Sequence, residues 1–529
     1  MENKYDVIII GSGIGGMSAG FILSKLFGKK VLILERHFKL GGFTHIFKRK
    51  ANYVWDVGVH YIGEMHEGSE ARKMMDFLTG GKVKWQRMPE VYDKGVFPDF
   101  TFDFEAGEEN LKSALINQFP NEKDTILRYF EDMNKVMKWS RKYQILQAMP
   151  GFIGKLLKGY KYAGSELSLQ TTQNYLDKNF NDEKLKALLV TRYGDHGLPP
   201  SESSFLIHAV IMQHYMKGGY FPVGSSKTIA DSMIPAIEAN GSKALMNHEV
   251  KEIVVKNGRV SGVRATEKKG NEYIEREYFA DSVISNAGAE ITYNRLLKGE
   301  QFSGIRINLE KVFKPVGNVT LYIGLKQNPE ELGFTGANHW IYAGYDINKL
   351  HTYRNELLDG KVNMAFLSFP SMKNEKAPGH TAEIISFIDY ESFTKWANEP
   401  WKNRGADYQL LKDKISEALI NFINERYPGF RDAVDYFELS TPLSTEFFTG
   451  NRGGNIYGIP ATPERYRQEW IGYRTPVKNL YLAGTDSTAH GITGAMMGGV
   501  LAAAVSQGMP FSMGKIMKAV TIAAKNSSS

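Results

Sequence analysis

The chain begins with an apolar run that leads into three regularly spaced glycines. Residues 5–16 read YDVIIIGSGIGG, an apolar strand followed by Gly11-x-Gly13-x-x-Gly16. A continuous apolar run is typical of a strand that is buried on both faces of a parallel sheet. Residues 17–27 are helix-like, and a second apolar strand, VLILE, follows and ends in Glu35. This order predicts a βαβ unit at the N-terminus.

The spacing of the glycines is typical of a dinucleotide site. Gly11 permits a tight turn after the strand, Gly13 lets a pyrophosphate approach the backbone, and Gly16 lets the next helix pack closely. The phosphates would bind the free N–H groups of that helix. Glu35 follows at about the 20-residue spacing at which a carboxylate accepts hydrogen bonds from a ribose. The alternative is a structural βαβ unit in which the glycines occur by chance.

The spacing of apolar positions changes twice in the middle of the chain. Between residues 107 and 215, segments such as DTILRYFEDMNKVMKW and SFLIHAVIMQHYM have apolar positions three and four residues apart, which predicts a helical insertion. A turn and an amphipathic helix ending at Gly241 follow, and residues 249–288 read as strands joined by the hairpin signal Asn257-Gly258. Residues 300–445 alternate strands with helices, as a mixed α+β domain would.

The C-terminal part supplies a second glycine-rich element. Residues 477–508 read as a strand, a glycine-rich loop and a helix, whose N-terminus could face a cofactor or substrate. The tail from Met509 predicts a terminal helix. A chain of 529 residues needs more than one domain, and here one domain is interrupted by others. We expect a first, second and third part of a dinucleotide-binding domain at 1–106, 216–300 and 451–510, a helical insertion at 107–215, an α+β substrate domain at 301–450 and a tail at 511–529.

Composition removes several kinds of chemistry. The chain has no cysteine, which excludes disulfides, thiolate zinc sites, active-site dithiols and cysteinyl flavin links. Redox chemistry must therefore belong to a bound cofactor, and we predict no metal site. The formal charge of +7 favours binding to anionic membranes or acidic ligands. The simpler interpretation is that the basic side chains are only solvated. We predict no nucleic-acid binding.

Targeting and membrane signals are limited. The first strand begins near residue 5, which leaves no room for a signal peptide and predicts a cytoplasmic protein. The sequence has no apolar run of 18 or more residues, but peripheral contact with the inner face of a membrane remains open. Residues 135–164 interleave basic and large apolar residues without any acid, which favours a segment that lies on an anionic bilayer or borders a lipid tunnel. An ordinary amphipathic helix pair packed on the core is the alternative. The basic residues are Lys135, Lys138, Arg141, Lys142, Lys155, Lys158 and Lys161.

Four separated blocks carry a resemblance to a known class. GSGIGG with Glu35, DVGVHYIG, the strands ending in SVISNAG, and NLYLAGTD with GITGAMMGG resemble, in this order, the phytoene desaturase and amine oxidase class of flavoproteins. Residues 194–230, GDHGLPPSESSFLIHAVIMQHYMKGGYFPVGSSKTIA, resemble its retinol saturase and carotenoid isomerase branch. The resemblance covers nearly the whole chain and is weaker in residues 300–445. It implies a Rossmann-type α/β fold and FAD as the cofactor.

The resemblance also assigns site residues. Glu35 and the neighbouring Arg36 would lie at the adenosine ribose, Val250 at the adenine, and Asn286 in the turn after its strand. Ala495 and Met496 would begin the helix that faces the isoalloxazine, where the helix dipole stabilises negative charge. The pyrophosphate would be held by Gly11, Ser12, Gly13, Ile14, Gly15 and Gly16. The flavin would be bordered by Gly42, Phe43, Thr44, His60 and Tyr61. The ribityl region would contact Gly484 and Asp486.

The implied activity is reduction of a carbon–carbon double bond in a long apolar polyene: a retinoid, a carotenoid or a polyunsaturated fatty acid. His60 and Tyr61 are candidates for proton delivery, and the alternative is that they only shape the pocket. Other interpretations are redox-neutral isomerisation, desaturation, amine oxidation and a non-enzymatic lipid carrier. The second glycine-rich element does not repeat the first motif, so electrons would come from a redox protein, a small molecule or transiently bound NAD(P)H.

Overall fold

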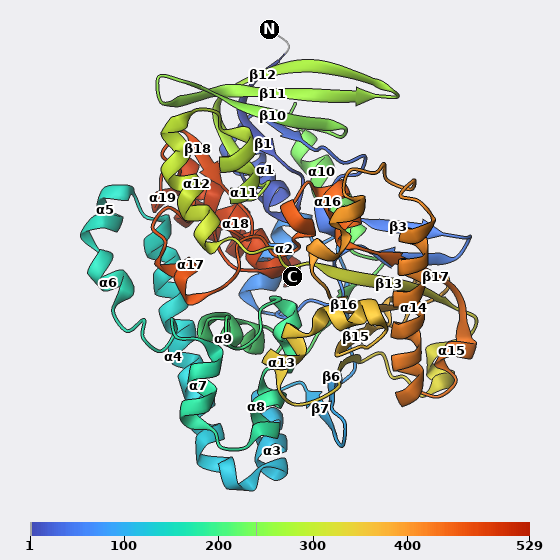
Figure 1. Ribbon diagram of the computed structural model, residues 1–529. Coiled ribbons are helices and arrows are strands. Elements are labelled where there is room, and N and C mark those ends of the chain that lie inside the picture. The colour runs from blue at the N-terminus through green and yellow to red at the C-terminus, as the bar shows by residue number, and fades with distance from the viewer. Residues whose placement is uncertain (1–2, 240, 529) are drawn as a thin grey trace.

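The computed structural model describes residues 3–239 and 241–528, and within them two seven-stranded sheets organise the chain (Figure 1). The first sheet has the order β10-β11-β12-β1-β2-β9, and β18 pairs with β12. Its strands are β1 Lys4–Ile10, β2 Val31–Leu34, β9 Lys243–Leu245, β10 His248–Lys256, β11 Arg259–Lys269, β12 Glu272–Ser285 and β18 Leu480–Leu482.

The apolar first strand lies at the centre of this sheet. β1 pairs in parallel with both β12 and β2, and its side chains are buried on both faces, with Val7 and Ile9 in one core cluster and Ile8 and Ile10 in another. Helix α1 (Ile14–Phe27) follows and packs against α10 (Lys227–Glu238) and α18 (Gly491–Ser506). The predicted βαβ unit and the Rossmann-type fold are thus confirmed. The hairpin at Asn257-Gly258 is confirmed as well, with φ values of 50° and 72° that suit a tight turn.

The second sheet has the order β17-β13-β16-β15-β14-β6-β7. Helix α14 (Ala406–Arg426) covers it with Ile415, Leu419 and Ile423, and this shared core joins the elements of the expected α+β region. The strands are β6 Val91–Val96, β7 Thr101–Glu105, β13 Asn318–Leu325, β14 Asn338–Tyr342, β15 Met364–Ser368, β16 His380–Phe387 and β17 Val434–Ser440. β6 and β7 lie within the segment assigned by sequence to the dinucleotide domain, yet β6 pairs in parallel with β14.

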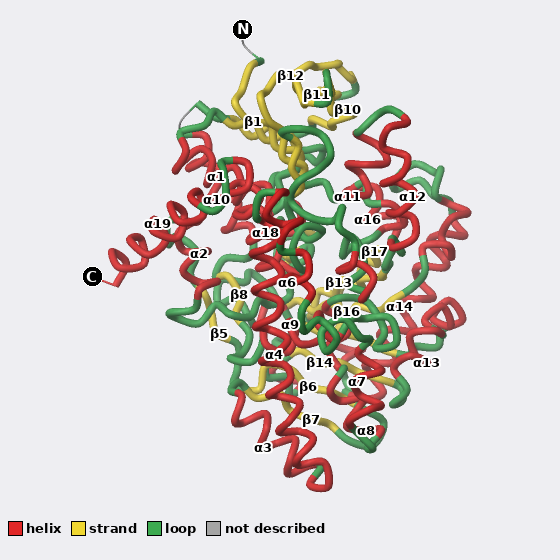
Figure 2. Tube along the Cα trace, turned by 90° about the vertical axis from the view of Figure 1, so that its left-hand side faces the viewer, coloured by secondary structure: helices red, strands yellow, loops and turns green. Residues whose placement is uncertain are grey.

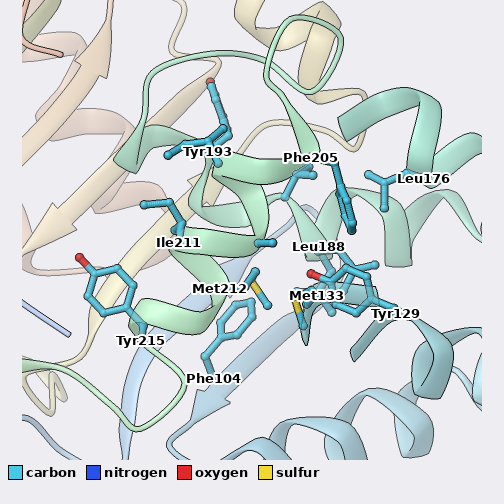
Figure 3. Packing of buried hydrophobic residues seen from close by; sticks show 14 of the residues in the cluster. Phe104, Tyr129, Met133, Leu176, Leu188, Tyr193, Phe205, Ile211, Met212 and Tyr215 are labelled. Carbon is cyan, nitrogen blue, oxygen red and sulfur yellow. The ribbon is translucent and has the colours of Figure 1, made fainter. Parts of the chain in front are cut away.

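The helical insertion is present at 108–214 (Figure 1). Figure 3 shows its core, in which Tyr129, Leu176 and Phe205 pack together, and the ring of Tyr175 stacks on Phe205 at 3.8 Å. The large aromatic side chains fix the short helices that individually would be unstable. The helices are α3 Glu108–Gln118, α4 Lys123–Ala148, α5 Gly151–Leu156, α6 Lys158–Tyr162, α7 Thr172–Asn179, α8 Glu183–Leu189 and α9 Phe205–His214.

The tail forms the expected terminal helix, α19 (Phe511–Ser528), which packs on α2 (Glu70–Thr79) and then projects from the body (Figure 2). Lys515 fastens it by donating to the carbonyl of Leu26 at 2.7 Å. Within residues 3–239 and 241–528, every helix is too short or too polar to cross a membrane.

Candidate functional site

A cavity of about 2040 Å³ lies between the two sheets. Its wall includes Ile10 and Val250 from the first sheet and Thr320 and Phe366 from the second. Ordinary small-molecule pockets measure about 300–1,000 Å³. This cavity therefore has room for a large cofactor and a second ligand beside it.

The N-terminus of α1 forms one end of the cavity and fits a pyrophosphate. Gly11, Gly13, Ile14 and Gly15 line the wall, and Gly11 has φ +91°, a conformation that favours glycine. A Cβ atom on Gly42 would lie 2.9 Å from Gly13 Cα, so the two loops approach at backbone distance. Among the described residues, no side chain caps this terminus and no acid lies in its first turn, which leaves it favourable for an anion.

Two members of the motif support this end without facing the cavity. Ser12 is fully buried, and its N–H and hydroxyl donate to Glu35 Oε2 at 2.8 and 2.7 Å. Gly16 packs against the carbonyl of Gly11, where a Cβ atom would lie only 2.1 Å from the oxygen. Both residues were expected to hold the pyrophosphate, but they do not line the cavity, because their side-chain positions close the strand-to-helix turn.

The adenosine end is built around Glu35. Its side chain is buried, lines the cavity and accepts a further hydrogen bond on Oε1 from the N–H of His37 at 2.9 Å. A carboxylate has about four acceptor positions, and the bonds from Ser12 and His37 use three of them, so one remains for a ribose hydroxyl. Arg36 and Val250 line the same part of the cavity, with Val250 on β10. The structure thus brings together the three residues assigned to this end.

Residues expected at the middle of the cofactor meet around Asn286. Its amide lies against Gly13, Gly15 and Gly484, and a Cβ atom on Gly484 would come within 2.7 Å of Asn286 Oδ1. Asp486 borders the cavity but is also a structural clamp. Its Oδ1 accepts from the N–H of Ile459 at 2.8 Å and its Oδ2 from that of Ala289 at 2.7 Å.

The flavin border includes a second helix N-terminus. Gly42, Phe43 and Thr44 all line the cavity, as does Ala495. These positions suit a planar ring system held between the loop after β2 and the last long helix of the domain.

The structure changes the assignment on α18. The helix begins at Gly491 rather than at Ala495, so Ala495 lies one turn inside it. Met496 is fully buried in the core between α1 and α18, whereas Ala495 and Met497 line the cavity. Successive helical residues are 100° apart, and a difference of one position turns a side chain from the cavity to the core.

His60 and Tyr61 stand where the two sheets meet, and both line the cavity. His60 Nδ1 lies 2.7 Å from Oε2 of Glu383, a fully buried residue of β16. The hydroxyl of Tyr61 donates to Asp93 Oδ2 at 3.0 Å and lies 3.3 Å from Asp195 Oδ2. Its ring stacks on Tyr215 with centroids 4.1 Å apart.

Sequence reasoning missed the buried charges behind these two residues. Arg192 lies 3.5 Å from Asp93 Oδ2, and the amide of Asn338 donates to Asp93 Oδ1 at 2.9 Å. Burial raises the pKa of Asp195 to about 8. Burial also lowers the pKa of Lys373 to about 7, against the opposing effect of the nearby acids. Lys373 donates to Asn338, to Ser368 Oγ at 2.7 Å and to the carbonyl of His60 at 3.0 Å. The available signal was a run of polar and ionisable residues, Arg192, Asp195 and His196, directly after the apolar segment 187–190.

Other parts of the wall carry charged side chains such as Arg404 and Lys412, but one stretch is apolar and aromatic. It fits an elongated apolar ligand, because few polar groups there would need a partner. Gly194 permits close packing, since a Cβ atom at this position would lie 2.4 Å from Trp340 Cζ3. Members of this wall are Ile211, Tyr215, Trp340, Phe366, Phe387 and Tyr457.

Comparisons with known proteins show similarity to a dinucleotide-binding family and to retinol reductases. Residues 9–78 match the NAD(P)-binding Rossmann-like domain family. The chain is similar to the all-trans-retinol 13,14-reductases of Danio rerio (31% identity, covering 94% of this chain and 85% of the relative) and Homo sapiens (30%, covering 95% and 85%). It is also similar to prolycopene isomerase from Arabidopsis thaliana, at 23% identity over 95% of this chain and 82% of the relative.

Solved structures support the fold. An oxidoreductase from Methanosarcina mazei matches with a TM-score of 0.62 at 17% identity, covering 94% of this chain and 99% of that one. Cyclohexylamine oxidase from Brevibacterium oxydans matches with a TM-score of 0.57 at 18% identity, covering 99% and 100%.

Proposed function

Because this chain belongs to the retinol saturase and carotenoid isomerase branch of the phytoene desaturase-like flavoproteins, we propose that it saturates a carbon–carbon double bond of a long apolar polyene with FAD as its cofactor. The observation that carries the proposal is the continuity of the cavity. The dinucleotide cradle and the aromatic wall open into the same space and meet at His60 and Tyr61.

The residues present fit FAD and leave room for a substrate. The N-terminus of α1 would hold the pyrophosphate and Glu35 the ribose. When bound and reduced, FAD supplies a hydride to one olefinic carbon. The aromatic wall aligns the polyene and excludes water, which keeps the reacting atoms in register. We expect the electrons to reach FAD from a redox protein or from transiently bound NAD(P)H.

Isomerisation is the second candidate, since prolycopene isomerases are among the relatives. It would use the same aligned chain without net electron transfer. The two reactions differ in the mass of the product. Anaerobically reduced protein should be mixed with retinoids, carotenoids and polyunsaturated fatty acids. A gain of two hydrogens supports saturation, whereas unchanged mass with shifted retention and absorbance supports isomerisation and refutes saturation. Failure to bind FAD would refute both.

We further propose that an anionic bilayer on the inner face of the cell membrane delivers the substrate. Large apolar side chains on α4–α6 are exposed, with Phe152 at 73% and Leu156 at 82%. Lys138 and Arg141 are exposed on α4, and Arg141 also lines the cavity, so α4 contributes to both the cavity wall and this surface. Apolar anchors next to basic residues bind anionic lipid surfaces. The side chain of Lys155 lies outside what the structure describes.

Liposome cosedimentation tests this docking surface. Replacing both Phe152 and Leu156 with Glu should abolish binding to anionic vesicles, because each anchor would become a repelled charge. Leu410→Glu is the control, since Leu410 is 69% exposed on α14, outside the helical insertion. Equal cosedimentation of the double variant and the control would exclude the proposed surface.

A further inference from the structure

Asp195 places a carboxyl group at the wall of the cavity. It ends the short helical segment Thr191–Asp195, directly after the glycine that packs on Trp340. Its side chain is partly exposed to the cavity, whereas Asp93, on the far side of the Tyr61 hydroxyl, is fully buried. Asp195 is therefore the member of this acidic pair that a ligand in the cavity can touch.

The surroundings of Asp195 hold a proton on it. Burial is the largest effect and the charge of Asp93 the second, and together they raise the pKa of Asp195 to about 8 against the opposing effect of Arg192. Two carboxylates this close do not both ionise readily. Burial raises the pKa of Asp93 too, but Arg192 and the amide of Asn338 stabilise its charge. The other titratable groups facing Asp195 are the hydroxyls of Tyr61, Tyr92, Tyr215, Tyr342 and Tyr457.

The hydrogen bonds give Tyr61 a positioning role. Its hydroxyl lies between the two acids, 3.0 Å from Asp93 Oδ2 and 3.3 Å from Asp195 Oδ2, and can donate its hydrogen to either carboxylate. The pKa of Tyr61 is well above its ordinary value because of burial and the nearby acids, which makes it a poor proton donor. His60 Nδ1 lies 2.7 Å from Oε2 of Glu383, so this nitrogen is directed at the fully buried carboxyl group.

We infer that Asp195 is the catalytic acid that protonates the polyene, an assignment that rests on the proposed saturation. One olefinic carbon accepts a hydride, which leaves the bound reduced flavin oxidised by two electrons. The π pair of the double bond forms a C–H bond at the other carbon with the proton of Asp195. The O–H bond of Asp195 breaks, its electron pair stays on the carboxylate, and a solvent proton restores the acid before the next cycle.

Single-turnover kinetics with FAD-loaded, anaerobically reduced protein and all-trans-retinol test the assignment. The isosteric variant Asp195→Asn should slow flavin reoxidation about 100–10,000-fold, the usual contribution of a positioned acid, while the Kd for retinol stays within threefold. The wild-type rate should be constant at neutral pH and fall as the pH rises through about 8. Asp195→Glu should restore part of the rate. Asp103→Asn, an exposed aspartate outside the cavity, should behave as wild type.

Infrared spectroscopy of the flavin-free protein gives an independent measurement. A protonated-carboxyl C=O band should be present at pH 7, disappear as the pH rises through about 8, and be missing in Asp195→Asn but not in Asp103→Asn. If Asp195→Asn does not fold, the wild-type band and pH profile decide the question. A turnover rate for Asp195→Asn within threefold of wild type, or an ionised Asp195 at pH 7, overturns the inference. A wild-type protein that forms no dihydro product refutes the proposed function itself, and with it the donor role, whatever the infrared result.

Discussion

Tyr61→Phe separates the two proton donors that the sequence and the structure suggest. The substitution keeps the ring, which stacks on Tyr215 at 4.1 Å, and removes the hydroxyl that lies 3.0 Å from Asp93 and 3.3 Å from Asp195. A hydrogen bond to a charged group contributes about 1.5–3 kcal/mol, so the variant should be less stable by an amount in that range.

The electrostatic consequence has a definite sign. The hydroxyl of Tyr61 lowers the pKa of Asp195, so its loss should move that pKa above its wild-type value of about 8. Asp195 would then remain protonated over a wider range. At pH 7 we expect flavin reoxidation with all-trans-retinol to slow less than tenfold, with the alkaline limb of the pH profile displaced to higher pH.

The assay is stopped-flow absorbance of the flavin in wild type, Tyr61→Phe and Asp195→Asn across pH 6–10, with thermal unfolding of each protein. His60→Phe should be measured alongside as the second candidate named by the sequence. If Tyr61→Phe loses more than a hundredfold in rate while its alkaline limb stays at the wild-type pH, Tyr61 is itself the donor and the reasoning is wrong.

Three further outcomes follow from the geometry. Gly499→Ala should lower the thermal midpoint and the bound FAD content, because its Cβ atom would lie 1.9 Å from the carbonyl of Gly15 and force α1 and α18 apart. Gly514→Ala is the control and should change neither quantity, because a Cβ atom there meets open space. Glu35→Gln should weaken FAD binding about 10–100-fold in a fluorescence titration, since it removes charge-assisted bonds worth about 1.5–3 kcal/mol, and unchanged affinity would exclude the ribose contact. Asp195 has a raised folded-state pKa of about 8, so the stability it contributes is present below its unfolded value and lost as the pH rises through about 8. The thermal midpoint of Asp195→Asn relative to wild type should therefore rise between pH 5 and 8, and a constant difference would contradict the raised pKa.

The local parts of this protein could be predicted from the sequence because short-range chemistry determines them. An apolar run with no polar alternation fits only a strand buried on both faces, and β1 lies at the centre of its sheet. The glycine spacing required backbone approach, and the structure places Gly42 against Gly13. Asn257-Gly258 specified a tight hairpin through its own φ preferences.

Tertiary structure decided the rest, because pairing and burial join residues that no local period connects. β6 entered the second sheet through a parallel pairing with β14, more than two hundred residues later. Met496 turned into the core because α18 begins at Gly491, which sets the phase of every later side chain. The acidic pair consists of Asp93 of β6 and Asp195 of the helical insertion, and the loop residue Tyr61 contacts both. A carboxyl group becomes a proton donor at neutral pH only when burial and a neighbouring charge raise its pKa, and those conditions exist only in the assembled fold.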